Sequence, residues 1–186
     1  KGTNGSTILS GTGSAQVGKW DDVSEGPCTY SNTYKLSGSL AFRGNFNSYD
    51  WGSIEANFPA NTRKVYGSWW WYIPAGTPLP GQGTTDGLNW KTVWIYDTIS
   101  NNNITLPNIH GDIEYHVFGN NLQYPLDDWI ILNYSSGKWM HIQAYVEVNS
   151  DGRGKVKLWE LTTSGVIQRM NASGSWNNGN PFRTIS

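Results

Sequence analysis

The strongest constraint on the fold is a strict alternation of side chains in residues 138–148, KWMHIQAYVEV. Successive side chains of a β-strand point to opposite faces of its sheet. One face of this segment is entirely apolar and consists of Met140, Ile142, Ala144, Val146 and Val148. The opposite face consists of Trp139, His141, Gln143, Tyr145 and Glu147. Because the second face combines aromatic rings with hydrogen-bonding groups, it raises the question of what binds or covers it.

The composition extends the strand prediction to the whole chain. The 186 residues include 11 Trp, 10 Tyr and 22 Gly, and only 15% are charged. Such a chain is poor in helix formers and rich in strand and turn formers. Strands are predicted at 38–44, 51–58, 65–73, 90–97, 111–118, 129–133, 138–149, 154–161 and 165–170, with a long loop at 74–87. We therefore expect an all-β protein, a jelly-roll β-sandwich of two antiparallel sheets with an extended N-terminal arm.

The length suits one domain with one core. We predict a single β-sandwich domain over residues 20–186 and an N-terminal arm over residues 1–19. The arm is rich in Gly, Ser and Thr, and its apolar side chains are Ile8, Leu9, Ala15 and Val17. An arm of this kind suits docking as a donor strand on a neighbouring sheet, where main-chain hydrogen bonds give affinity and Ile8 or Leu9 fixes the register. Packing of the arm against its own domain is the alternative.

Charge and hydropathy exclude several partners. The net charge is -1 and the pI is near 6.3, without a cluster of Lys and Arg, so no nucleic-acid partner is expected. No apolar run approaches the length of a membrane span. The single cysteine, Cys28, cannot form an internal disulfide. A start at Lys1 without Met favours a secreted chain located outside the cell or on its surface, although an engineered start would look the same.

Asp112, Glu114 and His116 form the sharpest constellation of ionisable residues, because they share one face of the strand predicted at 111–118. The stretches WGSIEANFP and HGDIEYHVFGNN resemble the strands of laminarinase-type glycosidases, in which a Glu-x-Asp-x-x-Glu run carries catalysis. Here Asp112 and Glu114 replace the first Glu and the Asp, and the acid/base position falls on Val117. No catalytic residue is therefore assigned.

Loops that combine acidic or amide side chains with Gly suggest a calcium site, because this cation prefers several oxygen ligands. The candidate ligands are Asp21, Asp22, Glu25, Asp127, Asp128, Asn149 and Asp151. The alternative is that these are solvated turn residues. The three histidines, His110, His116 and His141, are not spaced as zinc ligands and are better explained as structural residues.

The segments KWMHIQAYVEVNSDGRGKVKLWE and LSGSLAFRG together resemble the concanavalin-like lectins and the polysaccharide lyases of the heparin and glucuronan lyase type. In those families a Trp opens a strand that ends in Asn, an Asp-Gly turn follows, and a Trp-bearing strand returns, as in Trp139, Asn149, Asp151, Gly152 and Trp159. The resemblance covers residues 36–161 and implies the jelly-roll fold. From its residues, the polar and aromatic face of this strand is either a subunit contact or a glycan platform, and the candidate glycan-binding residues are Trp139, His141, Gln143, Tyr145 and Glu114.

A lyase would in addition need a base, for which Tyr145 or His141 would serve, and a cation such as Lys155 or Lys157 to neutralise a uronate. In overall plan the chain is also similar to the calcium-dependent tubule (cannula) proteins and donor-strand pilus subunits of archaeal cell surfaces. That similarity implies a homo-oligomer or polymer. The first hypothesis is an extracellular structural subunit that assembles into a filament or tube by N-terminal strand donation, stabilised by calcium. The alternative is a carbohydrate-binding module or a polysaccharide lyase acting on extracellular glycans.

Overall fold

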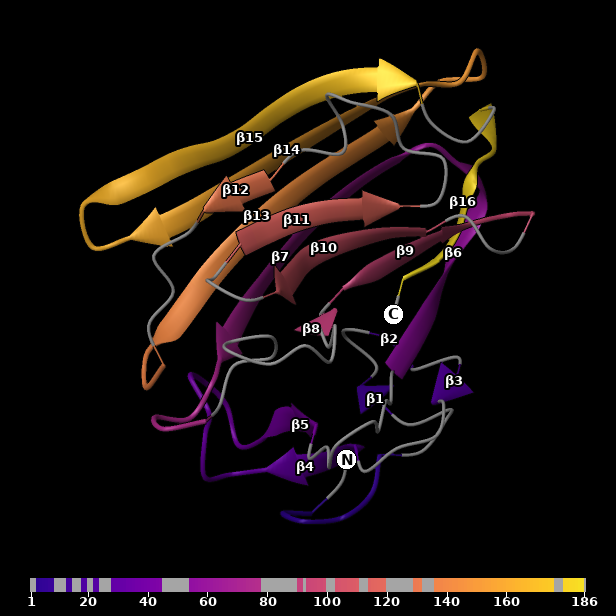
Figure 1. Cartoon of the computed structure of the whole chain (residues 1–186). Coiled ribbons are helices and arrows are strands. Elements are labelled where there is room, and N and C mark those ends of the chain that lie inside the picture. The colour runs from indigo at the N-terminus through magenta and orange to yellow at the C-terminus, as the bar shows by residue number, and fades with distance from the viewer. Residues whose placement is uncertain are drawn as a thin grey trace. The chain divides into compact units, whose positions relative to one another are not determined.

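The computed structural model describes residues 3–8, 13–14, 18–19, 22–23, 28–44, 54–77, 90–91, 93–99, 103–110, 114–119, 129–131, 136–175 and 179–185. Within these ranges the chain consists of strands, turns and bends, without an α-helix (Figure 1). The prediction of an all-β protein is confirmed. No helix in this described part has the length and apolar character needed to cross a membrane.

The chain divides into two compact units. Unit 1 comprises Lys1–Asn57 and Thr184–Ser186, and unit 2 comprises Phe58–Arg183. The boundary predicted between residues 19 and 20 lies inside unit 1. Two strands, β6 (Ile54–Thr62) and β16 (Phe182–Ile185), run through the boundary between the units.

Unit 1 contains short antiparallel pairs of strands. β1 (Gly13–Ser14) pairs with β2 (Gly18–Lys19), β3 (Asp22–Val23) pairs with the start of β6, and β4 (Cys28–Ser31) pairs with β5 (Ala41–Gly44).

Burial raises the pKa of the Cys28 thiol, so this side chain is a protonated core residue at neutral pH.

Unit 2 contains a four-stranded antiparallel sheet in the order β15-β14-β13-β7 (Figure 1). Its strands are β7 (Lys64–Tyr72), β13 (Trp139–Val148), β14 (Arg153–Thr162) and β15 (Gly165–Ser175). A second sheet has the order β12-β11-β10-β9-β16-β6-β3, with β8 also paired to β10. Its remaining strands are β8 (Trp90–Lys91), β9 (Trp94–Asp97), β10 (Asn103–His110), β11 (Glu114–Gly119) and β12 (Trp129–Ile131). This arrangement gives unit 2 a β-sandwich-like character.

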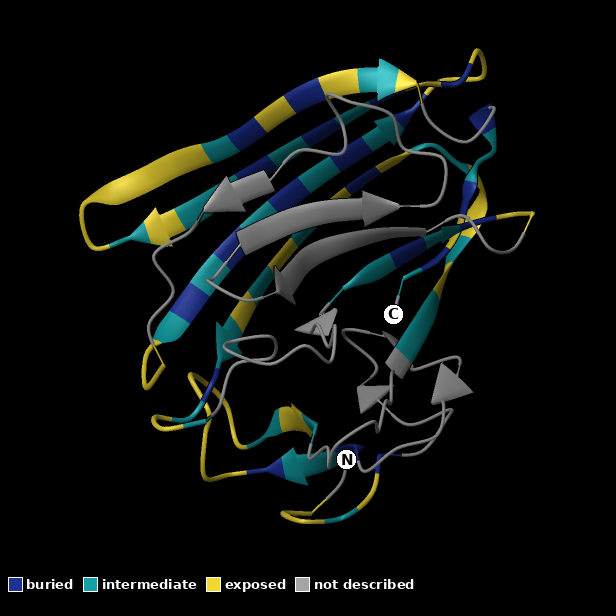
Figure 2. Ribbon diagram, viewed as in Figure 1, coloured by how far each residue is buried: buried dark blue, intermediate teal, exposed yellow. Residues whose placement is uncertain are grey.

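The core of the four-stranded sheet lies on the apolar side of β13. Buried and partly exposed residues alternate over the whole strand, as Figure 2 shows, and the buried set is the one predicted from the sequence. The flanking strands continue this side with Val65, Val156, Leu158, Met170 and Ala172, all of them buried. Antiparallel neighbours pair in register, so residues opposite one another share a face. The alternation of the two faces therefore extends over β7 and most of β14, and over β15 from Met170 onward, beyond the register shift.

Strand β10 was not predicted from the sequence, and the strand predicted at 90–97 is two strands in the structure. Residues 103–110, NITLPNIH, contain Pro107 and two Asn residues, which are types disfavoured in strands. The register between β10 and β11 shifts between Thr105 and Asn108, so Pro107 lies in an irregular part of the ladder. The strand predicted at 90–97 forms the two short strands β8 and β9. Of the loop predicted at 74–87, residues 74–77 are described and include a turn at residues 75–76, whereas residues 78–87 lie outside the described ranges.

Removing a buried side chain from this core should destabilise the fold. Leu158 is 1% exposed, so Leu158→Ala should lower the free energy of unfolding by about 2–5 kcal/mol through lost burial and a residual cavity. Gln168→Ala on the exposed start of β15 is the matched control and should change stability by less than about 0.5 kcal/mol. Urea unfolding followed by tryptophan fluorescence measures both. Equal loss in the two variants would contradict this assignment of the core.

Candidate functional site

The side of the four-stranded sheet opposite its core is accessible over its full length, and we call it the outer face. Every residue of this face is half-buried or exposed. The face comprises Lys64, Tyr66, Ser68, Trp70 and Tyr72 on β7, Trp139, His141, Gln143, Tyr145 and Glu147 on β13, Lys155, Lys157, Trp159 and Leu161 on β14, and Val166, Gln168, Asn171 and Ser173 on β15. Aromatic rings gather at one end of the face and charged groups at the other.

The aromatic end is produced by the register of β7 and β13. Tyr72 lies opposite Trp139, with ring centroids 5.2 Å apart, and Trp70 lies opposite His141. The row through His141 continues to Leu161 and Val166 on the next two strands. Trp70 is 45% exposed although it lies in a sheet. A large aromatic surface is therefore presented to solvent on rigid backbone.

His141 holds the Trp70 ring in place. The two rings are stacked, with centroids 4.4 Å apart and an interplanar angle of 16°. Ser68 Oγ lies 2.7 Å from His141 Nε2, in hydrogen-bond contact. His141 Nδ1 is buried, and no hydrogen-bond partner for it lies among the described groups. One ring nitrogen is thus engaged and the other is buried, which suits a supporting role better than that of a base.

The charged end of the outer face is organised around Glu147. Tyr145 Oη donates a hydrogen bond of 2.8 Å to Glu147 Oε2, and Lys64 Nζ lies 3.3 Å from Glu147 Oε1. The hydrogen bond from Tyr145, followed by the Lys64 and Lys155 ammonium groups, lowers the pKa of Glu147 against the opposing effect of burial. Glu147 is therefore ionised at neutral pH.

The pKa of Tyr145 shifts in the opposite direction. Burial raises it first, and the hydrogen bond to Glu147 and the negative charge of that carboxylate raise it further. The phenol therefore stays protonated at neutral pH. A protonated phenol is a hydrogen-bond donor and acceptor, but it is not a base.

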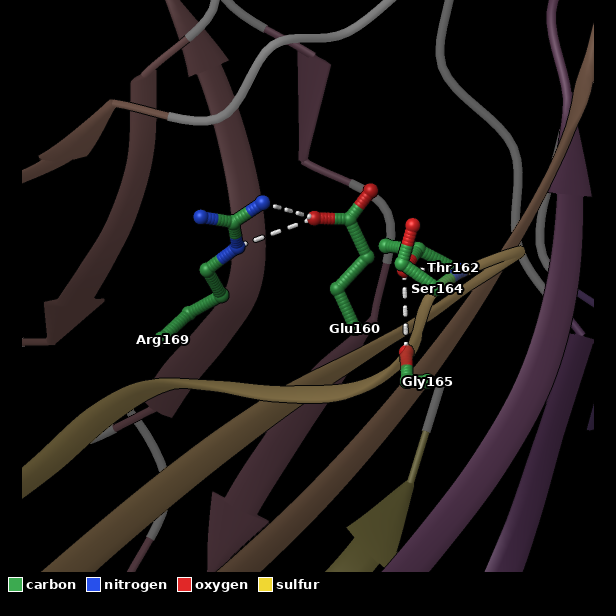
Figure 3. A network of polar contacts seen from close by, with 5 residues as sticks. All are labelled: Glu160, Thr162, Ser164, Gly165 and Arg169. Atoms are coloured by element: carbon green, nitrogen blue, oxygen red, sulfur yellow. Dashed lines mark hydrogen bonds and ion pairs between the residues drawn. The ribbon is translucent and has the colours of Figure 1, made fainter.

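A cleft of about 430 Å³ adjoins the aromatic end. Trp70, Trp139 and Leu161 line it from the outer face, and Lys138, Glu160 and Thr163 are also in its wall. Arg169 Nε and Nη2 donate to Glu160 Oε2 over 2.9 and 2.6 Å (Figure 3). The adjacent β14–β15 turn is tied by Thr162 Oγ1, which donates to the Gly165 carbonyl and accepts from the Ser164 amide (Figure 3). These contacts fix the wall of the cleft.

Of the five glycan-binding residues predicted from sequence, four lie together. Trp139, His141, Gln143 and Tyr145 share the outer face of β13. Glu114 belongs to β11 in the other sheet, so it does not share this face. Sequence reasoning missed the contribution of β7, above all Trp70. Three consecutive Trp residues conceal which of them faces solvent, and only the pairing of β7 with β13 assigns Trp70 to the outer face.

The three ionisable residues predicted to share a face at 111–118 are Asp112, Glu114 and His116. Asp112 lies outside the described ranges. In the backbone register Glu114 is opposite His110, and His116 is opposite Asn108.

Two predicted calcium ligands, Asn149 and Asp151, lie in the β13–β14 turn. Asp151 Oδ1 accepts from the Arg153 amide over 3.0 Å, and Oδ2 lies 3.3 Å from Arg153 Nε. Asp22 belongs to β3, of which only the backbone is described, and Asp21, Glu25, Asp127 and Asp128 fall outside the described ranges. In the part of the chain that is described, no three or more His, Cys, Asp or Glu residues are grouped so that they could hold a metal ion. Calcium binding stays a prediction.

The predicted donor residues are described only in part. Ile8 is 1% exposed, and its amide donates to the Cys28 carbonyl over 3.0 Å. Thr7 forms a bridge with Thr29, and Gly5 and Ser6 exchange backbone hydrogen bonds with Tyr30. Residues 5–8 therefore pair with β4 of the same chain. Leu9, Ala15 and Val17 lie outside the described ranges.

Comparison with known proteins adds no assignment. No protein-family model matches the chain, and no curated protein has significant sequence similarity to it.

The lowered pKa of Glu147 predicts an acid-dependent loss of stability. Its stabilising effect is complete above the ordinary value of 4.5 and is lost as pH falls through the lower pKa of the folded state. Glu147→Gln should therefore be less stable than wild type at pH 7, and the difference should shrink below pH 4.5. Urea midpoints between pH 3 and pH 7 test this. A difference that is independent of pH would show that Glu147 acts by packing alone.

Proposed function

We propose that this chain is a non-catalytic carbohydrate-binding module that holds a polysaccharide along the outer face. The observation that carries the proposal is that the exposed Trp70 and the half-buried Trp139, on adjacent strands, both line a cleft at the aromatic end of the outer face. Aromatic rings offer an apolar surface to the carbon-bound hydrogens of a sugar ring, and neighbouring polar groups fix its orientation. Gln143, Tyr145 and Ser68 supply such groups in the rows that follow.

The outer face is preorganised for this role. The Trp70 ring is held by His141, and His141 is held by Ser68. Ordering these groups in advance reduces the entropy lost on binding. From Trp139 to Tyr145 the strand advances by roughly 20 Å, which is long enough to contact several consecutive sugars.

The polar groups on the outer face favour binding over lyase chemistry. A lyase base must accept a proton from the sugar ring. Tyr145 is protonated and donates to Glu147, while His141 has one nitrogen in contact with Ser68 and the other buried. Both groups suit hydrogen bonding to hydroxyl groups of a bound glycan. Formation of unsaturated sugar ends on incubation with a polyuronate would restore the lyase alternative.

We propose the jelly-roll connectivity of the concanavalin-like lectins for this β-sandwich, supported by antiparallel pairing and by neighbours that are distant in the chain, β13 with β7 in one sheet and β9 with β16 and β16 with β6 in the other. We also propose an extracellular or cell-surface location, because polysaccharides long enough to lie along the outer face occur there.

Truncating either tryptophan should weaken binding. Trp70→Ala and Trp139→Ala should each weaken retention in affinity gels containing immobilised polysaccharides by about tenfold or more, because each removes a stacking surface. Ile99→Ala is the control: this side chain is 64% exposed, in the turn that follows β9, and should leave retention unchanged. Far-ultraviolet circular dichroism confirms folding. Wild-type protein that binds no member of a broad polysaccharide panel would remove this proposal.

Self-assembly is the second candidate function: residues 5–8 pair with β4 of the same chain, which is the alternative considered from the sequence, and a neighbour's segment could take their place by exchange. A segment that pairs within its own chain makes the same contacts when exchanged with a neighbour, which is a low-cost route to oligomers. Ile8 would be the anchor, since it is fully buried in this pairing. Repeated exchange in one direction would give a filament or tube, and calcium bound at the acidic loops would stabilise it.

Sedimentation velocity tests the assembly hypothesis. Full-length protein should form large species as its concentration rises with calcium present, and Ile8→Asp should not, because a carboxylate cannot occupy the buried position of Ile8. If the wild type sediments as a monomer at every concentration, with calcium and with chelator, the assembly hypothesis is wrong.

Calcium at a hundredfold excess over its Kd should add ~2.7 kcal/mol to the free energy of unfolding. Identical melting curves with calcium and with chelator would exclude calcium binding.

A further inference from the structure

Two lysines on β14, Lys155 and Lys157, lie at the charged end of the outer face, where the Lys155 ammonium helps to lower the pKa of Glu147. Lys155 lies between Glu147 on β13 and Ser173 on β15. Lys157 lies between Tyr145 and Asn171 in the next row. Residues directly opposite one another on a sheet have Cβ atoms about 5 Å apart, so each lysine is within reach of both neighbours.

Among the described residues the charge of these lysines is compensated only in part, because one carboxylate, Glu147, faces three ammonium groups, those of Lys64, Lys155 and Lys157. Glu147 is the acidic group in the adjoining rows, and its two carboxylate oxygens are engaged by Lys64 and Tyr145. Within the described part of the chain, neither Lys155 nor Lys157 forms an ion pair with a carboxylate. Lys157 faces a phenol and an amide, which are both neutral. Counted over the described residues, this end of the outer face therefore has an excess of positive charge.

Neutral hydrogen-bond donors lie next to each lysine. Asn171 and Ser173 are exposed on β15, on the same face, opposite Lys157 and Lys155. A carboxylate or sulfate has several acceptor oxygens, and one such group can bind an ammonium and an amide or hydroxyl donor at once. Two residues of strand separate the two rows, so two anionic groups roughly 7 Å apart would be bound together.

We propose that the glycan bound on the outer face is acidic, and that Lys155 and Lys157, with Ser173 and Asn171, bind its carboxylate or sulfate groups. This inference rests on the proposed function. The aromatic end binds the apolar face of a sugar ring, and the lysine rows select polymers that carry negative charge. Charge complementarity thus determines which class of polysaccharide is held, while stacking provides affinity common to all classes.

Matched polymers separate the two contributions. Polygalacturonate and the same polymer with its carboxyl groups reduced to alcohols differ only in charge, and dextran sulfate and dextran form a second pair that tests sulfate. Dissociation constants are measured by titration calorimetry at low salt and at 0.15 M salt. The variants are the double substitution Lys155→Gln with Lys157→Gln, and the control Lys35→Gln. Lys35 is an exposed residue of unit 1 that lies in neither sheet, so its substitution changes charge without altering the outer face.

Wild-type protein should bind at least one acidic polymer about tenfold more tightly than its neutral partner, and added salt should reduce the difference. The double variant should lose this preference and keep its affinity for the neutral polymer, whereas Lys35→Gln should behave as wild type. Preference for polygalacturonate assigns carboxylates, and preference for dextran sulfate alone assigns sulfates. Equal affinity for charged and neutral partners, or an unchanged preference in the double variant, would overturn the inference and leave glycan binding intact. Failure to bind all four polymers would overturn it together with the proposed function.

Discussion

Burial of one side of β13 is the interaction on which the rest of unit 2 depends. Its apolar residues are covered only in the observed register, because a shift of one position would bury Tyr145 and Glu147 and expose Val146. The cost of burying a charged carboxylate without its partners excludes that alternative. Since β7 and β14 pair with β13 over almost its full length, the same constraint sets the register of the neighbouring strands. The outer face is thus a consequence of core packing.

The outer face is stabilised by contacts between its own residues. At one end an aromatic ring is supported by an imidazole, and at the other a phenol, a carboxylate and an ammonium group form a chain of polar contacts. Such networks limit side-chain motion and leave few groups to be ordered when a ligand binds. The arrangement costs stability where a polar atom is buried without a partner, as at His141 Nδ1 among the described groups. Loss of stability of this kind is common where a surface is shaped for recognition.

Local pattern predicts part of this structure, and long-range pairing determines the remainder. The two faces of β13 follow directly from the period of two in its sequence, because every position alternates without exception. The aromatic end could not be predicted in full, since Trp70 lies far from His141 in sequence and one of three consecutive Trp residues had to be chosen. β10 escaped prediction because Pro107 interrupts its pattern. For the acidic loops, sequence could not show that Asp151 pairs with Arg153 only two residues away.

The irregularity between β14 and β15 has a bearing on how this sheet tolerates change in length. Leu158 pairs with Met170 and Trp159 pairs with Gln168, so Arg169 is the additional residue of a β-bulge. On both sides of it the pairing sets outer-face residues of β14 opposite outer-face residues of β15. Elsewhere in these strands a lost residue would exchange the two faces, but loss of Arg169 would leave both sides in their present register. Chains related to this one by descent are therefore expected to vary in length at this position first, and a deletion here would remove the ion pair with Glu160 while preserving the outer face.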